Sequence, residues 1–215
     1  MKKITLALFA LCVGLTTSRA ATDQEVVNDS VEILHQFYHL PEHQIPRRIM
    51  ENARGLAIMR VVKAGFVFSG KGGQGLVVAR TGHGWSGPSF IALGGAGWGL
   101  QIGAQVTDFV FVLNNEAAVR AFSRDGNFKL GADVSAAAGP VGRDAQAAVT
   151  PTAAVYSYSR SQGLFAGVSV EGAVIGTEKD ANTRYYGHHV SARAILRGNV
   201  PAPAGARRLL AVLSR

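Results

Sequence analysis

The fold is decided by residues 55–103, which read GLAIMRVVKAGFVFSGKGGQGLVVARTGHGWSGPSFIALGGAGWGLQIG. This stretch holds more than half of the chain's 26 glycines, and short apolar runs of Val, Ile, Leu and Phe separate them. A flexible linker lacks such runs, whereas β-strands need them to fill a core. The stretch therefore predicts a folded β structure with tight turns and close approaches between backbones.

The same pattern of apolar runs and turn residues continues toward the C-terminus. Turns are expected at Lys63-Ala64-Gly65, at residues 70–73, 81–84 and 125–127, and at Asp180 to Thr183. Between these turns the sequence predicts strands at 56–62, 65–69, 75–80, 88–93, 100–113, 128–135, 152–160, 164–175 and 187–196. The strand 100–113 is apolar on both faces near its end, which predicts a central strand covered on both sides.

Four helices are expected around this sheet. Residues 22–40 have apolar side chains at helical spacing, and Thr22 with Glu25 forms a capping box. Pro46 favours the start of a second, short helix that stops at Gly55. Further helices are expected at 116–122, capped by Asn114 or Asn115, and at 205–213.

These elements together predict an α+β fold that is mainly β. We expect a glycine-rich antiparallel sheet or barrel-like core, with N-terminal helices and a short C-terminal helix. Residues 21–215 would form one domain, because a chain of this length can bury a sizeable single core. Asp108 lies in the apolar strand 100–113, so we expect an arginine partner, with Arg143 and Arg80 as candidates.

Residues 1–20 have the pattern of a secretory signal peptide. Lys2 and Lys3 precede an apolar run from Ile4 to Leu15, and SRA follows at 18–20. We expect cleavage before Ala21 and export to the periplasm or the extracellular space. The only cysteine, Cys12, lies in this segment, with lipidation there as an alternative, so neither disulfides nor thiol catalysis is expected in the mature chain.

The charge of the chain favours an anionic partner. The net charge is +8, and removal of residues 1–20 lowers it to +5 because three basic and no acidic residues are lost. No run of Lys or Arg exceeds two residues, and zinc-finger and RNA-binding aromatic patterns are absent, which argues against nucleic acid. No apolar stretch beyond the signal is long enough for a transmembrane helix, so membrane contact would be peripheral.

Motifs for catalysis and cofactors are weak. Residues 70–75, GKGGQG, match the dinucleotide fingerprint, but a predicted strand follows where a helix is required. A hairpin tip is favoured there, and a nest of backbone N–H groups that grips phosphate with Lys71 is the alternative. His35, His39 and His43 are spaced for a metal, but a polar helix stripe explains them better. We expect neither an enzyme nor a metal or cofactor.

Basic residues near the glycine-rich turns are the candidate ligand contacts. Each alone fits ordinary solvated charge, but as a set with an aromatic side chain they are typical of a surface that meets anionic lipid. The candidate lipid-binding residues are Arg47, Arg48, Arg60, Lys63, Lys71, Arg80 and Trp85.

The order of several short motifs resembles the SYLF domain family over about residues 45–213. The matching motifs are IP (45–46), ARGLAI (53–58), KAGF (63–66), GLVVAR (75–80), WSGPS (85–89), GLQIG (99–103), TD (107–108), GPVGR (139–143), YSYSR (156–160), GLFAG (163–167), YYG (185–187) and ILRG (195–198). The resemblance implies a module that binds phosphoinositides, in some members together with actin. In an exported protein it implies anionic phospholipid or phosphoinositide-like head groups as ligands, without catalysis. The alternative is an envelope scaffold that binds a protein partner without lipid.

Overall fold

The structure is a computed structural model that describes residues 21–39, 45–140, 153–162 and 174–214. The expected signal peptide lies outside these residues. Helices and strands follow one another in this order: α1 (Asp23–His39), α2 (Arg47–Asn52), β1 (Gly55–Thr81), β2 (Gly84–Trp85), β3 (Ser89–Leu113), α3 (Glu116–Phe122), β4 (Asn127–Lys129), β5 (Ala136–Ala138), β6 (Val155–Gln162), β7 (Val174–Thr177), α5 (Lys179–Tyr186), α6 (Ala192–Leu196), η1 (Ala204–Ala206) and α7 (Arg207–Leu213).

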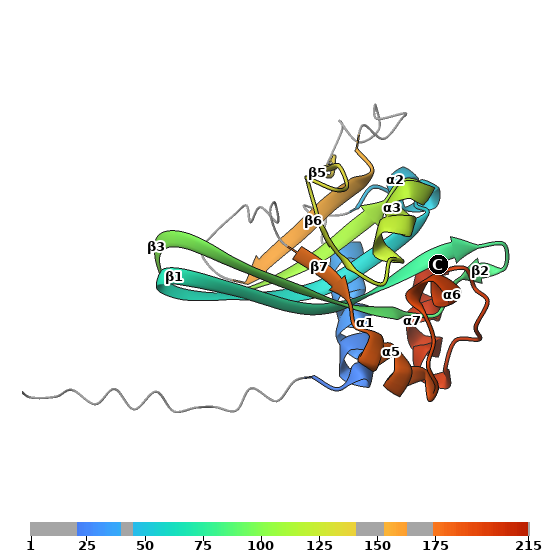
Figure 1. Ribbon diagram of the computed structural model, residues 1–215. Helices are drawn as coiled ribbons and strands as arrows, with labels where there is room; N and C mark the ends of the chain where they lie inside the picture. Colours follow the sequence, from blue (N-terminus) through green and yellow to red (C-terminus); the bar gives the residue numbers. More distant parts are fainter. Residues whose placement is uncertain (1–20, 40–44, 141–152, 163–173, 215) are drawn as a thin grey trace, which may run out of the picture.

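One mostly antiparallel sheet forms the centre of the molecule, which confirms the expected α+β class. The strand order is β2-β1-β3-β6-β5, with β7 on β3 and β4 on β7, and among the strand pairs of the described residues only that of β5 with β6 is parallel. β1 and β3 pair from Gly55 opposite Leu113 to Val77 opposite Ser89, with a register shift between Phe66 and Phe68. Both long strands curve back at one end of the sheet (Figure 1).

Alternating side chains fill a core on each face of this sheet. Leu56 and Ile58 of β1 belong to one buried cluster, which α1 and α7 cover. Ala57 and Met59 belong to the other cluster, which includes the buried face of α3. Figure 1 shows α1 beneath the curved sheet and α3 above it. β3 is buried on both faces near its end, as its sequence predicts.

Close approach within β1 explains two of its glycines, Gly73 and Gly75. A Cβ atom built on Gly75 would lie 2.2 Å from the carbonyl oxygen of Ile58, and one on Gly73 would lie 2.8 Å from that of Arg60. The two halves of β1 therefore lie against each other at a distance that side chains would prevent. The turns predicted at 63–65 and 70–73 are wrong, because β1 continues through both.

Three helices form where the sequence predicts them, and side-chain caps mark the starts of two of them, α1 and α3. The Thr22 amide donates to Glu25 at 2.6 Å and the Glu25 amide donates to Thr22 Oγ1 at 3.3 Å, so the capping box of α1 is confirmed. Asn115 caps α3 by accepting from the Ala118 amide at 2.9 Å. In the C-terminal helix α7, Leu209 is fully buried against α1 and the sheet.

The predicted strand 187–196 is wrong, because residues 187–191 connect α5 to α6 and residues 192–196 form α6. α5 ends at Gly187, whose φ of +75° is the left-handed conformation that favours glycine. α6 then begins after Ser191, whose side chain accepts from the Ala194 amide at 3.2 Å. The predicted strand 128–135 is shortened to β4, and most of the predicted strand 164–175 lies outside the described residues. Within the described ranges, no helix has both the length and the apolar character needed to span a bilayer.

We expect the close approach in β1 to tolerate no side chain at residue 75. Gly75→Ala places a methyl group against the backbone of Ile58 and Met59, so it should lower the free energy of unfolding by about 3 kcal/mol or more. Gly72→Ala is the matched control on the same strand, since a Cβ there meets nothing within 4 Å. It should change stability by less than about 0.5 kcal/mol in urea denaturation. Equal effects of the two variants would contradict the described packing.

Candidate functional site

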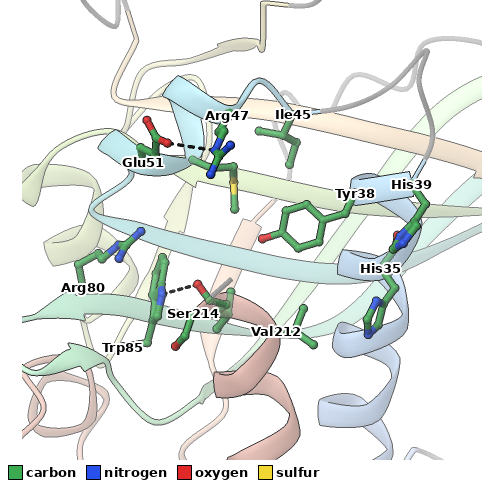
Figure 2. A pocket seen from close by; sticks show the side chains of 12 residues that line it. His35, Tyr38, His39, Ile45, Arg47, Glu51, Arg80, Trp85, Val212 and Ser214 are labelled. Carbon is green, nitrogen blue, oxygen red and sulfur yellow. Dashed lines mark hydrogen bonds and ion pairs between the residues drawn. The ribbon is translucent and has the colours of Figure 1, made fainter.

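A pocket of about 660 Å³ opens between α1, α2, α7 and the β1–β2 turn (Figure 2). This volume lies within the range of about 300–1,000 Å³ that is typical of small-molecule sites. α1 contributes His35, Tyr38 and His39, and the other lining residues are Ile45, Arg47, Met50, Glu51, Arg80, Trp85, Val212, Leu213 and Ser214. We call this space the helical pocket.

Aromatic and aliphatic side chains form the apolar part of the helical pocket. The indole Nε1 of Trp85 donates to the carbonyl oxygen of Leu213 at 2.9 Å, which ties α7 to β2. Tyr38 packs from α1, and burial raises the pKa of its phenol although the positive charge of Arg80 acts in the opposite direction. Val212 and Leu213 are buried on the α7 side. These groups offer an apolar surface to a ligand.

Two arginines stand where this apolar surface meets solvent. The guanidinium carbon of Arg80 lies 4.4 Å from the centre of the Trp85 ring, a cation–π contact. Arg47 reaches the carboxylate of Glu51 at 3.2 Å, and both side chains are largely exposed. Such an exposed pair within one helix is weak, so Arg47 can exchange Glu51 for an external anion at little cost. Arg48 is exposed beside it on α2.

The two histidines of α1 also line the helical pocket. Their ring centres are 6.1 Å apart, and the Nδ1 atom of His39 lies 2.8 Å from the carbonyl oxygen of His35. His43, the third histidine in this series of three spaced four residues apart, lies outside the described residues. In the described part of the chain, no group of three or more His, Cys, Asp or Glu side chains is placed to hold a metal ion.

Arg60 has a different environment from the other candidate residues. Its Nε lies 2.7 Å from Asp108 Oδ1, and its NH1 nitrogen lies 3.1 Å from Asp29 Oδ2 of α1. The hydrogen bond that Arg60 donates to Asp108 and the charges of both carboxylates raise the pKa of Arg60 despite its partial burial. The buried carboxylate of Asp108 thus has an arginine partner, as expected. The partner is Arg60 rather than Arg80, and Arg143 lies outside the described residues.

Lys63 and Lys71 lie on either side of the register shift in β1. Burial lowers the pKa of Lys71, and the nearby charge of Lys63 lowers it further. Residues 70–75 pair with 91–96 of β3, and the described glycines with positive φ are elsewhere. The expected hairpin tip and the alternative phosphate nest at this motif are therefore both wrong, because the segment is part of a strand ladder.

The structure thus divides the seven candidate residues into three groups. It brings Arg47, Arg80 and Trp85 together around the helical pocket, with Arg48 on the same helix as Arg47. Lys63 and Lys71 form a separate pair on β1, and Arg60 joins α1 to the sheet. The helical pocket is also lined by Tyr38, Met50 and Val212, which were not candidates from the sequence, although their apolar character and the expected docking of α7 were the available signals.

Comparison with known proteins finds a family model and several proteins that are similar to this chain. Residues 94–215 match the model of the family Ysc84, described as "Las17-binding protein actin regulator". The chain is 50% identical over 174 residues to protein YSC84 of Saccharomyces cerevisiae, a match that covers 79% of the chain and 37% of that protein. It is 42% identical over 192 residues to the human SH3 domain-containing YSC84-like protein 1, covering 86% of the chain and 56% of that protein. The chain therefore spans between about a third and three fifths of these relatives.

We expect Arg60 to contribute mainly to stability. Arg60→Gln leaves the buried Asp108 carboxylate without its charged partner, which should cost about 3 kcal/mol in the free energy of unfolding. Arg47→Gln is the control, because its exposed partner Glu51 is already solvated, and it should cost less than about 1 kcal/mol. Chemical denaturation measures both values, and an Arg60→Gln protein as stable as the Arg47→Gln protein would contradict this role.

Proposed function

The chain belongs to the Ysc84 family, the family of the SYLF domain, and from this membership we propose that it binds anionic phospholipid head groups at a membrane surface. The observation that carries the proposal is the helical pocket, where Arg47 and Arg80 stand beside an apolar surface that includes Tyr38 and Trp85. The function is binding without catalysis.

The geometry of the helical pocket suits a molecule that is charged at one end and apolar at the other. An anionic phosphate would meet the guanidinium groups of Arg47 and Arg80, for which planar bidentate hydrogen bonds are favourable. The glycerol region and the first methylene groups would then lie against Trp85 and Val212. Each basic residue near an anionic membrane adds about 1 kcal/mol, so a few suffice for reversible peripheral contact.

The N-terminal sequence supports an envelope location for this activity. Residues 1–20 are proposed as a signal peptide, which leaves residues 21–215 as one SYLF domain outside the cytoplasm, in the periplasm or the extracellular space. Phospholipid surfaces are abundant in such a compartment. The net charge of +5 after cleavage favours their anionic members.

A protein partner is the second candidate, and the names of the relatives favour it. Two relatives from Saccharomyces cerevisiae strains, each 48% identical over 174 residues, are named LAS seventeen-binding protein 3. The corresponding proposal for this chain is an envelope scaffold that docks a protein without direct lipid contact. The two proposals predict different effects of salt on binding. Salt weakens binding between charged groups, whereas it does not weaken the docking of apolar surfaces.

We expect the purified chain to co-sediment with acidic vesicles and not with neutral ones, and to be released as salt rises. The charge-neutralising pair Arg47→Gln/Arg48→Gln on α2 should weaken the apparent affinity about tenfold or more, since two contacts of about 1 kcal/mol are lost.

The matched control for this experiment is Arg207→Gln/Arg208→Gln on α7. These two arginines are also adjacent and exposed, but they do not line the helical pocket. The control should retain its affinity within about twofold, which is the change expected for loss of distant charge alone. Equal losses of affinity in the two double variants would show that the helical pocket is not the site of lipid contact. Absence of binding to both kinds of vesicle would favour the protein partner.

A further inference from the structure

A second cleft, of about 680 Å³, lies where α3 and α6 meet the end of β1. Its walls carry five arginines and one carboxylate, namely Arg80, Arg120, Arg124, Arg193, Arg197 and Glu116. We call it the arginine cleft. Four of these arginines were not candidates from the sequence, because they come from separate elements and one of them, Arg193, fell in a segment predicted to be a strand.

The packing of α3 on the sheet determines which of its side chains line the cleft. Ala118 and Phe122 are inaccessible to solvent and pack into the sheet cluster that contains Met59. Arg120 is exposed on the helix, and Arg124 is exposed just beyond its end. The packing of the apolar face thus leaves both guanidinium groups available to line the cleft.

α6 supplies the facing wall in the same way. Ser191 caps the helix, and Ile195 and Leu196 are buried beneath it. Arg193 and Arg197 are exposed, four residues apart, so they lie above one another on the helix surface. Like charges at this spacing repel each other weakly, and a bound anion would relieve this repulsion.

The positive charge of the cleft is not neutralised within the described part of the molecule. The ion pairs there involve Arg47, Arg60 and Arg184, and none of the five cleft arginines. Glu116 is the single acidic group on the walls, and it forms no ion pair among the described residues. The guanidinium carbon of Arg80 lies over the Trp85 ring, and the side chain is exposed to solvent, where it can meet an anion.

We propose that the arginine cleft binds a compact anion that carries two or more phosphate groups. Five guanidinium groups exceed what one carboxylate or one phosphate can engage, whereas several phosphate oxygens can accept bidentate hydrogen bonds from facing helices. The concave shape and volume fit a small molecule or a head group better than a flat protein surface. This site shares Arg80 with the helical pocket, its other lining residues are different, and it does not depend on the lipid proposal.

A phosphorylated lipid head group and a soluble phosphate ester share this chemistry, so the experiment has two arms. In the first, inorganic pyrophosphate is titrated into the purified chain by calorimetry. In the second, the chain is sedimented with phosphatidylcholine vesicles that contain or lack phosphatidylinositol bisphosphate. Arg193→Gln/Arg197→Gln should weaken binding about tenfold or more, as expected when charge-assisted hydrogen bonds are removed.

Arg207→Gln/Arg208→Gln is the matched control, since it removes the same charge from exposed positions outside the cleft. It should leave binding within about twofold in both arms. A second cleft variant, Arg120→Gln/Arg124→Gln, should reproduce the loss from the facing wall, and thermal unfolding checks that each variant is folded.

The two arms separate the sources of the phosphate. A specific loss in the pyrophosphate arm supports a soluble ligand, and a specific loss confined to the vesicle arm supports a head group. Binding that is unchanged in both cleft variants, or absent in both arms, overturns the proposal. If Arg47→Gln/Arg48→Gln lost vesicle binding and the two cleft variants kept it, the helical pocket would be the lipid site. The arginine cleft would then not contact the membrane.

Discussion

The close approach of the two halves of β1 is the constraint on which the rest of the structure depends. Gly73 and Gly75 allow the backbone of one half to lie against Arg60 and Ile58 of the other. A strand that folds back in this way places apolar side chains on both faces of one curled sheet, so each face needs its own cover. α1 and α7 cover one face, while α3 with part of α6 covers the other.

The two clefts follow from these two layers of helices. The helical pocket forms where α1, α2 and α7 meet around Trp85, and the arginine cleft forms where α3 and α6 meet. Arg80 lines both, because it lies at the end of β1 between the two layers. The ion pairs of Arg60 with Asp108 and Asp29 fix α1 on the sheet and so hold one wall of the helical pocket in place.

Elements with local signals could be predicted from the sequence. The capping box at Thr22 and Glu25, the cap at Asn115 and the docking of the C-terminal helix each depend on a few neighbouring residues. The continuity of β1 could not be predicted, because glycine is used there for tertiary contact and looks the same as a turn residue. α5 and α6 are short, and apolar residues near Ile195 fit a strand pattern equally well, although the signals at Gly187 and Ser191 were present.

The candidate site was predicted only in part, for a related reason. Arg47, Arg80 and Trp85 meet at the helical pocket, but Arg60 is a structural ion-pair partner and Lys63 with Lys71 forms a separate pair. The charge of a residue can be read from its sequence, whereas its partners depend on elements far apart in the chain. For the same reason, the arginines of α3 and α6 could not be predicted as members of one site.

Hydrogen–deuterium exchange with acidic vesicles tests the central claim most directly, because it locates the contact without altering the chain. The account predicts slower amide exchange in α2 and at the C-terminal end of α7, the segments that border the helical pocket, and no change with neutral vesicles. Protection confined to other segments, or none with acidic vesicles, would contradict membrane contact through this pocket.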